Sequence, residues 1–515
     1  MPRTEMRVRR RGRRATRAAC FALATVAAAC ASAQDAKSSR PFVISPSVSL
    51  QQTVTDNVSL TSTNRHADAI TESTAAIRVD SRAGRVRGFL DYAVTARVGT
   101  RDSDASDVRH ALNAALAAEL VEDWAFVDLR GSISQQAISA FGKQSFEPGL
   151  DNSNQTQVAT FGIAPYVRGR LGSLANYEAR VDHSVSRSGT AAAFDVSATT
   201  ASARLNGGVP GQAFSWSVDA SRQVSDFSDG LQYQSDRLRG VLTYAVNREL
   251  SLSVIGGREV NDFESEDQRT YNNSGAQVRW VPNQRTSLSA LFERRFFGNA
   301  HAVDFTYRTP RTAWSFTDSR DVASTPERLA RVRLGIVYDL FFAQFASLEP
   351  DPVLRDVLVR RFLQVNGINP NTPIFGGALA SGAVVQRLQS LSFALNGVRN
   401  TLTFRTLFSD NARVSRFGAL NQDLNDASAV RQRAFFIDLA HRLTPTSSAN
   451  LAFGRQRTTG SLDEQSSTLN SLSGMWSQSL TPRVGVSAGA RIVRFNSATQ
   501  PYTERAVFGN IRVQF

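Results

Sequence analysis

The last seven residues of the chain, Gly509 to Phe515, read GNIRVQF. Apolar and polar residues alternate in this stretch: Ile511, Val513 and Phe515 form one set, and Arg512 belongs to the other. A period of two predicts a β-strand with one apolar and one polar face. Chain ends are usually frayed and polar unless the fold holds them. A terminal strand that ends on an aromatic residue is therefore either an exposed edge strand or one strand of a closed barrel.

The same period of two recurs along the chain, for example in residues 90–98, 177–185, 214–220 and 238–246. These segments approach the length of about 9–11 residues that a tilted strand needs to cross a bilayer. Beyond the N-terminal segment there is no apolar run of about 18 residues, so spanning by α-helices is excluded. Alternation alone leaves two folds open. A soluble sandwich turns its apolar faces inward, whereas a membrane barrel turns its apolar face toward lipid.

The connections between these segments favour the membrane barrel. Short connections that contain Pro282, Pro445 or Pro482 alternate with long polar ones such as 134–155. Proline cannot donate to a strand ladder and therefore marks strand ends. Outer-membrane barrels have short periplasmic turns and longer outer loops. The sequence thus predicts an all-β fold, a closed antiparallel up-and-down transmembrane β-barrel of roughly 22 strands, within a range of about 16–24. Its last strand is expected to pair with a first strand around residues 43–54.

The N-terminal segment predicts export. Residues 1–33 combine an arginine-rich start, a short apolar run and the small-residue site Ala31-Ser32-Ala33, which is the pattern of a cleaved signal peptide. Residues 34–515 are then predicted to form the barrel of a protein of the cell outer membrane. Both cysteines lie in the signal peptide, so no disulfide is expected in the mature chain. The arginines of this segment also raise the net charge of +14. That charge is therefore poor evidence for a nucleic-acid partner, and none is expected.

One long connection, at residues 323–382, breaks the strand rhythm. Within it, Asp351 suits a helix N-cap and Pro352 the first helical position, and Gly367 suits a helix end. The spacing of apolar residues predicts an amphipathic helix near 351–365. Its buried face is expected to consist of Leu354, Val357, Leu358, Arg361 and Val365. Two roles stay open: a constriction or lid of the lumen, or a helix packed on the outer rim. Because the inner wall is predicted to be polar, the outer mouth is the expected place.

Residues that carry chemistry do not converge in this sequence. None of the five histidines belongs to an H-x-x-x-H or H-E-x-x-H pair, and no G-x-S-x-G or nucleotide-binding motif is present. We therefore expect no enzyme activity, no catalytic residues, no metal and no cofactor. Arginines on the polar faces of the predicted strands suit a hydrated lumen with a mild preference for anions. The lumen-facing candidates are Arg87, Arg97, Arg180, Arg279 and Arg512.

Three segments together resemble one family. They are PSVSLQQTVTDNVSLTS from Pro46, QTQVATFGIAPYVRGRLGSLANYEARV from Gln155, and WVPNQRTSLSALFERRFFGNAHAVDFTYRTPRTAWSFTDS from Trp280. They are similar to the PEP-CTERM system-associated outer-membrane proteins of Gram-negative bacteria. The resemblance implies a β-barrel in an envelope with exosortase sorting and exopolysaccharide loci, and it carries no functional residues over. The terminal Phe515 also resembles the assembly signal that the barrel assembly machinery reads.

Two functions follow as expectations. The first is a porin-like channel or export conduit for polar solutes or exopolysaccharide. The alternative is a structural or surface-interaction barrel with a sealed lumen, whose outer loops contact the extracellular matrix. In both cases the expected partners are outer-membrane lipid and the barrel assembly machinery, and exopolysaccharide is an expected cargo of the first.

Overall fold

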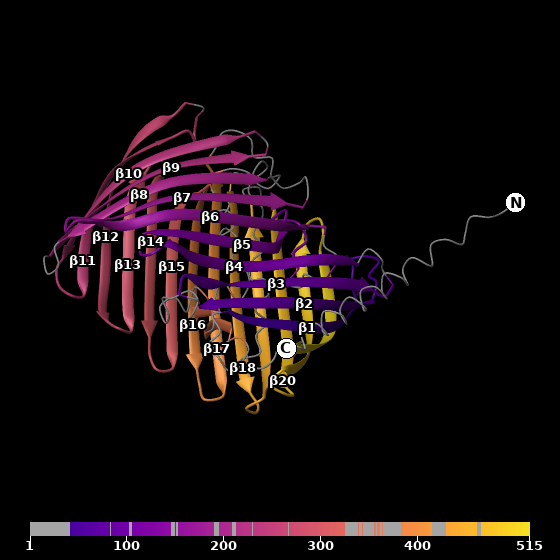
Figure 1. Ribbon diagram of the computed structural model, residues 1–515. Helices are drawn as coiled ribbons and strands as arrows, with labels where there is room; N and C mark the ends of the chain where they lie inside the picture. The colour runs from indigo at the N-terminus through magenta and orange to yellow at the C-terminus, as the bar shows by residue number, and fades with distance from the viewer. Residues whose placement is uncertain are drawn as a thin grey trace.

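The chain forms a single antiparallel sheet of 22 strands that closes on itself. Figure 1 shows the computed structural model, in which the early strands β1 to β9 cross the direction of the later strands β12 to β18 as the wall curves round. The predicted fold, a closed up-and-down barrel of roughly 22 strands, is confirmed. The residues that the structure describes are 42–82, 84–101, 106–145, 150, 153–189, 195–208, 213–228, 230–265, 267–324, 338, 342, 355–356, 358–360, 363, 383–414, 429–460 and 465–515. The predicted signal peptide lies outside them.

Each strand pairs with its neighbours in chain order. The strands are β1 (Phe42–Thr55), β2 (Asp68–Arg82), β3 (Val86–Gly99), β4 (Asp107–Val121), β5 (Ala125–Ala137), β6 (Gln155–Leu171), β7 (Ala175–Ser188), β8 (Val196–Gly208), β9 (Phe214–Phe227), β10 (Gln232–Ala245), β11 (Leu250–Asn261), β12 (Arg269–Asn283), β13 (Thr286–Arg295), β14 (Gly298–Arg308), β15 (Thr312–Ala323), β16 (Val384–Asn396), β17 (Asn400–Arg413), β18 (Ala429–Arg442), β19 (Ser447–Thr459), β20 (Ser466–Ser479), β21 (Val484–Ser497) and β22 (Tyr502–Gln514).

The barrel closes where β1 meets β22. The register places Val48 opposite Val513, and the backbone N–H of Phe515 donates to the carbonyl of Pro46 at 3.0 Å. Because the terminal strand is paired on both sides, it offers no free edge to another chain. The expected pairing of the last strand with the segment around 43–54 is therefore confirmed.

Alternate residues of each strand point to opposite sides of the wall. In β9, Trp216 and Val218 are 40% and 37% exposed, whereas Ser217 and Asp219 line an interior cavity. Exposed apolar side chains recur in this way on most strands. The apolar face therefore looks outward, toward lipid, and the polar face lines the lumen. A soluble sandwich would bury Val218 between two sheets, so that alternative is excluded.

The connections distinguish the two ends of the barrel. Those that follow even-numbered strands are short, such as 172–174 and 284–285, whereas those that follow odd-numbered strands include the long 138–154 and 324–383. In outer-membrane barrels the short turns mark the periplasmic end and the long connections mark the outer end.

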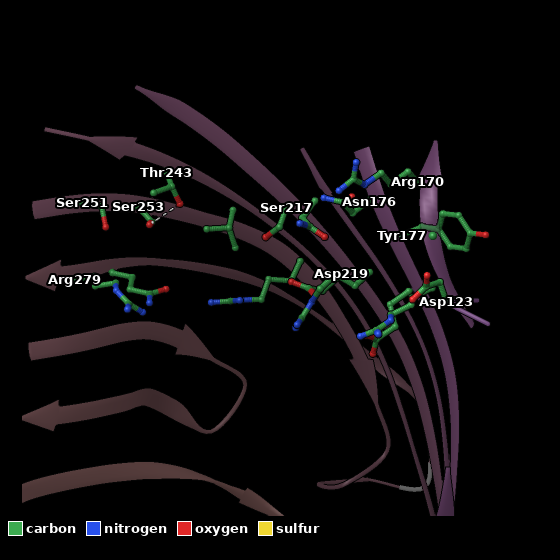
Figure 2. Close-up of a pocket in the computed structure, with 18 residues that line it drawn as sticks. Asp123, Arg170, Asn176, Tyr177, Ser217, Asp219, Thr243, Ser251, Ser253 and Arg279 are labelled. Atoms are coloured by element: carbon green, nitrogen blue, oxygen red, sulfur yellow. Dashed lines mark hydrogen bonds and ion pairs between the residues drawn. The ribbon is translucent and has the colours of Figure 1, made fainter. Parts of the chain in front are cut away.

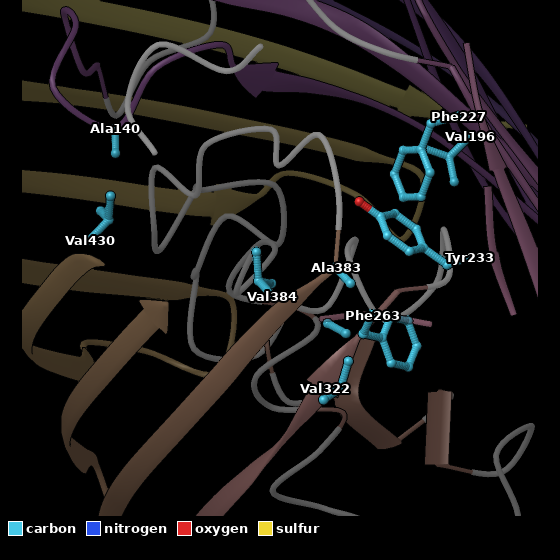
Figure 3. Packing of buried hydrophobic residues seen from close by; sticks show 10 residues of the cluster. Ala140, Val196, Phe227, Tyr233, Phe263, Val322, Ala383, Val384 and Val430 are labelled. Carbon is cyan, nitrogen blue, oxygen red and sulfur yellow. The ribbon is translucent and has the colours of Figure 1, made fainter. Parts of the chain in front are cut away.

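Buried apolar side chains gather at the outer end, inside the wall. One cluster is shown in Figure 3 and contains Ala140, Val196, Phe227, Tyr233, Phe263, Val322, Ala383, Val384 and Val430. The other contains Val58, Leu60, Ile70, Leu150, Leu469, Val493, Phe495 and Tyr502. Both join the ends of strands to residues of the connections, so the outer end of the lumen is partly filled by side chains.

Helical backbone occurs in the connection between β15 and β16. Within the stretch 351–365 the described residues are Arg355, Asp356, Leu358, Val359, Arg360 and Leu363, and all six are helical. The other residues of the expected buried face lie outside the described residues. Among the described residues, no helix is long and apolar enough to cross a membrane.

The buried face of this helix differs from the prediction. Leu358 is 42% exposed, whereas Val359 and Leu363 are buried, at 0% and 1%. Asp356 is buried as well, at 0%. The prediction uses only the spacing of apolar residues. In the structure, the face of the helix that is buried carries the carboxylate of Asp356 as well as Val359. A polar inner wall disfavours a dry apolar contact, yet it accepts a helix face that carries charge.

The helix lies against the inner wall instead of resting at the outer mouth. Asp356 pairs with Arg78 of β2, and Arg360 pairs with Asp91 of β3. Arg78 and Asp91 lie near the turn that joins β2 to β3, which is a periplasmic turn. The described part of the long connection therefore reaches deep into the lumen, and the expected position at the mouth is wrong.

Deleting Phe515 is expected to lower the yield of folded barrel more than the stability of barrels that do assemble. The residue adds one backbone hydrogen bond at the seam, which is worth about 1 kcal/mol in a finished barrel. Heat-modifiable protein in outer-membrane fractions measures the yield. A Gln514→Ala chain, which keeps Phe515, is the control. Equal yields from the full chain and from a chain that ends at Gln514 would contradict a role in assembly.

Candidate functional site

A polar cavity of about 1060 Å³ lies against the inner wall of β6 to β12, near the periplasmic turns. Figure 2 shows its labelled side chains spread along the curved wall, from Arg279 and Ser253 on one side to Asn176 and Asp123 on the other. Thr243 and Ser253 are joined by a hydrogen bond of 2.8 Å. Nearly all of the lining side chains are polar or charged, which suits a water-filled lumen.

Five charged residues form a row across this wall. The strand register places Arg168 opposite Glu178, and Glu178 opposite Arg204. The row continues from Arg204 to Asp219 and then to Arg239. Positive and negative side chains thus alternate over β6 to β10, with the spacing of about 4.7–4.9 Å between neighbouring strands. Together these five residues form the charged row.

Positive charge is the more accessible charge in the cavity. The exposed arginines of its lining are Arg168, Arg170, Arg204 and Arg279. The acids Glu178 and Asp219 are only half-exposed, and the pair between Asp219 and Arg204 uses one charge of each sign, which leaves Arg168, Arg170 and Arg279 as further exposed arginines. Asp123 is exposed, but it lies in the turn between β4 and β5. A small anionic solute in the cavity can therefore contact more exposed arginines than the number of exposed carboxylates that a cationic solute can contact.

A second polar cluster joins the inner helix to the wall. The fully buried carboxylate of Asp356 accepts hydrogen bonds from Arg78 and from the hydroxyl of Tyr338. Arg360 donates to the same carboxylate at 2.9 Å and pairs with Asp91 at 2.7 Å. Together these five residues form the helix clamp. Because a buried carboxylate is stable only with such partners, the helix clamp specifies where the helix sits.

The titration of the helix clamp supports this role. Burial, and then the neighbouring charge of Asp356, raises the pKa of the Tyr338 hydroxyl. Tyr338 therefore stays protonated and donates at neutral pH. Burial by itself would lower the pKa of Arg360, but the carboxylates of Asp356 and Asp91 outweigh it, and the net shift is upward. Arg360 stays charged, so the ion pairs of the helix clamp persist across the neutral range.

Two of the arginines proposed from the sequence take part in wall ion pairs. Arg180 pairs with Asp128 at 2.8 Å, two strands away, and its guanidinium lies 4.1 Å from the ring centre of Tyr166. Arg97 is nearly buried and pairs with Asp107 at 3.0 Å. Neither residue lines the cavity. Their positive charge is largely neutralised within the wall.

The other three candidates lie in different places. Arg279 is exposed in the cavity. Arg512 is close enough to Asp91 and Arg360 to interact electrostatically with both, so it lies beside the helix clamp. Arg87 is exposed near the periplasmic end of β3. The five candidates therefore do not form one site, and their role in the passage of solutes stays a prediction, as does the assembly role of Phe515.

The charged row and the helix clamp contain none of the five lumen-facing arginines predicted from the sequence, although the polar strand faces that carry Asp91, Glu178 and Asp219 are predicted. A signal exists for part of the row. Partners in a hairpin lie at equal distances from its turn, so the short turn at 172–174 places Arg168 opposite Glu178. No comparable signal links Arg78 to Asp356, because these residues are 278 positions apart.

His110, His183, His301 and His441 lie on strands of the wall, whereas His66 lies in the connection between β1 and β2. His301 pairs with Asp318 at 3.0 Å, and Arg387 holds the same carboxylate at 2.7 Å. His183 contacts the hydroxyl of Thr199 at 2.9 Å. In the part of the chain that the structure describes, no group of three or more histidine, aspartate or glutamate side chains is placed to hold a metal ion.

No family model and no curated protein matches the chain. Solved structures do align with it. The siderophore receptor PirA from Pseudomonas aeruginosa is 9% identical with a TM-score of 0.44, over 92% of this chain and 80% of its own. The FrpB iron transporter from Neisseria meningitidis is 10% identical with a TM-score of 0.46, over 92% and 81%. A mutant ferric enterobactin receptor from Pseudomonas aeruginosa is 8% identical with a TM-score of 0.47, over 91% and 80%.

At such low identity the likeness concerns the fold alone. The strand pairing, the outward apolar face and the alternating connections of this chain make it a closed 22-stranded β-barrel of the outer membrane.

Proposed function

We propose that the barrel is an outer-membrane conduit for polar solutes, with a preference for anions. The observation that carries this proposal is the polar cavity along β6 to β12, in which exposed arginines outnumber accessible acids. A lumen lined by one accessible sign of charge concentrates ions of the opposite sign. The alternating charged row adds successive weak contacts, which suit passage better than tight binding at one point.

The inner helix narrows this conduit. A barrel of this strand number has a wide lumen unless other parts of the chain fill it. The helix clamp holds the helix against β2 and β3, whereas the cavity lies along β6 to β12, on a different arc of the wall. Solutes are therefore expected to pass on the side of the cavity.

Replacing Arg170 and Arg279 together with glutamine is expected to lower the preference for anions several-fold. Both side chains are exposed in the cavity, so the change removes accessible positive charge and leaves the charged row intact. Reversal potentials of the purified barrel in planar bilayers, measured under a salt gradient, give the ratio of anion to cation permeability.

The matched control replaces Arg258 and Arg494 with glutamine. Both are exposed and share a face with outward apolar residues, since Arg258 lies opposite Leu238, which is 54% exposed. The control removes the same charge from the outside of the barrel and should leave the permeability ratio unchanged. An anion preference that survives the cavity variant would contradict the proposal.

The second candidate function is a barrel with a sealed lumen that acts through its outer surface. The buried apolar clusters at the outer end favour it, because they fill part of the lumen with side chains such as Phe227, Tyr233 and Phe495. The same bilayer experiment separates the two functions. A barrel that inserts but carries no current would support the sealed alternative.

We also propose that the cargo is exopolysaccharide and that the barrel is linked to a PEP-CTERM system, as the resemblance implies. An acidic oligosaccharide added to one side of the bilayer offers a direct test. It should interrupt the current through the original barrel, and it should do so less in the variant that lacks Arg170 and Arg279.

A further inference from the structure

The outer end of the barrel also carries a set of arginines on its outside. They are Arg431, Arg433, Arg455, Arg457, Arg494 and Arg505, on strands β18, β19, β21 and β22. Together these six residues form the arginine belt. We propose that the arginine belt binds the phosphorylated headgroups of glycolipids in the outer leaflet of the membrane.

The outward direction of the arginine belt follows from strict alternation. In β18, Arg431 and Arg433 are exposed, whereas Gln432 and Ala434 are buried, at 1% and 3%. In β19, Arg455 and Arg457 are exposed, and the residues that alternate with them are buried on the lumen side. The arginines therefore share the face of the exposed apolar residues and point away from the conduit.

The arginine belt lies just beyond the apolar band. On the outward face of β19, the last apolar residue is Phe453, which is 37% exposed, and Arg455 is the next residue on that face. On β21 the same step leads from Ile492, 49% exposed, to Arg494. The apolar band of an outer-membrane barrel is about 25 Å tall and ends at the headgroups. The change from apolar residues to arginine thus occurs at the depth where headgroup phosphates lie.

The arginines face one another with little opposing charge. The register places Arg433 directly opposite Arg457. Like charges in directly opposite positions destabilise a sheet. Within the described residues, the ion pair of the belt is the one between Arg431 and Asp410, at 3.3 Å. A shared anion between Arg433 and Arg457 would replace this repulsion with attraction.

The neighbouring polar residues complete a surface for phosphate. Arg455 is opposite Asn470, and Asn470 is opposite Arg494. An amide between two arginines adds hydrogen-bond donors at the same level of the wall. Guanidinium groups bind phosphate through paired hydrogen bonds. Because the surface continues directly into the apolar band, a phosphate that is attached to acyl chains fits it better than a free ion does.

The test uses the purified full-length barrel in a zwitterionic detergent. Native mass spectrometry counts bound lipid after titration with a bisphosphorylated lipid A, with its dephosphorylated form, and with inorganic phosphate as competitor. The belt variant carries Arg433→Gln, Arg455→Gln and Arg457→Gln. A second variant carries lysine at the same three positions, which keeps the charge but loses the paired hydrogen bonds.

We expect the original barrel to bind the bisphosphorylated lipid and not the dephosphorylated form. The belt variant should bind it roughly tenfold more weakly or worse, since the loss of one charge-assisted contact is enough for that factor. The lysine variant should lie between the two. The matched control carries Arg248→Gln, Arg285→Gln and Arg311→Gln, which are exposed residues of the short turns, and should bind as the original barrel does.

Three results would overturn the proposal. The belt variant could bind as tightly as the original barrel. The dephosphorylated lipid could bind as well as the phosphorylated one, which would place the affinity in the apolar band alone. Inorganic phosphate at millimolar concentration could displace the lipid, which would assign the surface to a free anion.

Discussion

Asp356→Ala is expected to raise the single-channel conductance of the barrel several-fold. The carboxylate joins the inner helix to Arg78 of the wall, and it also accepts hydrogen bonds from Tyr338 and Arg360. Breaking a buried ion pair by removing one partner costs about 3–5 kcal/mol. Without the carboxylate, Arg78 and Arg360 also face each other as like charges. Of the helix clamp, only the pair of Arg360 with Asp91 then joins the helix to the wall. The helix should therefore move away from β2 and widen the path for ions, which planar-bilayer recordings measure.

Asp80→Ala is the matched control for this experiment. Asp80 also pairs with Arg78, at 2.6 Å, but it belongs to β2 and not to the helix. Asp80→Ala also removes a carboxylate partner of Arg78, but it leaves the helix attached. Conductance should then stay near that of the original barrel. If both variants conduct alike, the helix clamp does not control the width of the lumen.

The strands could be predicted because water and lipid dictate their pattern. A residue such as Val218 faces lipid and its neighbour Asp219 faces water, so each strand must alternate along its full length. The same requirement acts on every strand, and short turns with proline separate them. The approximate strand number therefore follows from the alternation and the turns, and the closure of β22 on β1 follows from a terminal strand that ends on an aromatic residue.

The register could be predicted only across the short turns. Arg204 and Asp219 are partners because they lie at equal distances from the turn between β8 and β9. Glu178 and Arg204 are partners across the longer connection between β7 and β8. A longer connection does not determine how the two strands are shifted along each other. The charged row crosses one such longer connection, between β7 and β8, which is why the sequence reveals it only in part.

The inner helix shows a different limit of prediction from the sequence. Hydropathy predicts its buried face by ranking Leu358 above Asp356. In the structure Asp356 is buried and Leu358 is exposed, because the surface opposite is a charged wall. The identity of that wall depends on Arg78 and Asp91, which are distant in sequence. Hydropathy predicts the buried face of a helix only when the facing surface is apolar.

The inner wall also contains a buried network that spans four strands. Glu293 of β13 is nearly fully buried and pairs with both Arg237 and Arg239 of β10, the latter at 3.3 Å. Two glycines of the intervening strands are packed closely on this wall. A Cβ atom would lie 2.5 Å from the carbonyl oxygen of Leu238 at Gly257, and closer still to that of Phe292 at Gly275. The glycines keep the wall clear of side chains between the arginines and Glu293.

Glu293→Ala is therefore expected to destabilise the barrel by about 3 kcal/mol. The change removes the carboxylate that neutralises Arg237 and Arg239 and leaves two like charges side by side, and breaking a buried pair costs about 3–5 kcal/mol. The arginine side chains are 25% and 19% exposed, so water recovers part of the loss and the lower end applies. Urea unfolding of the barrel in detergent, followed by tryptophan fluorescence, measures the free energy of unfolding.

The control for this prediction is Glu122→Ala. Glu122 is 80% exposed and lies 3.6 Å from Arg85 in the periplasmic turns, and an exposed pair of this kind contributes about 0–1 kcal/mol. A Glu293→Gln variant keeps the shape of the side chain and part of its hydrogen bonding, so it should fall between the original barrel and Glu293→Ala. If Glu293→Ala unfolds at the same urea concentration as Glu122→Ala, the network adds nothing to stability. The two arginines would then be accommodated by water in the lumen, and the inner wall at β10 to β13 would have to be far wetter than the burial of Glu293 indicates.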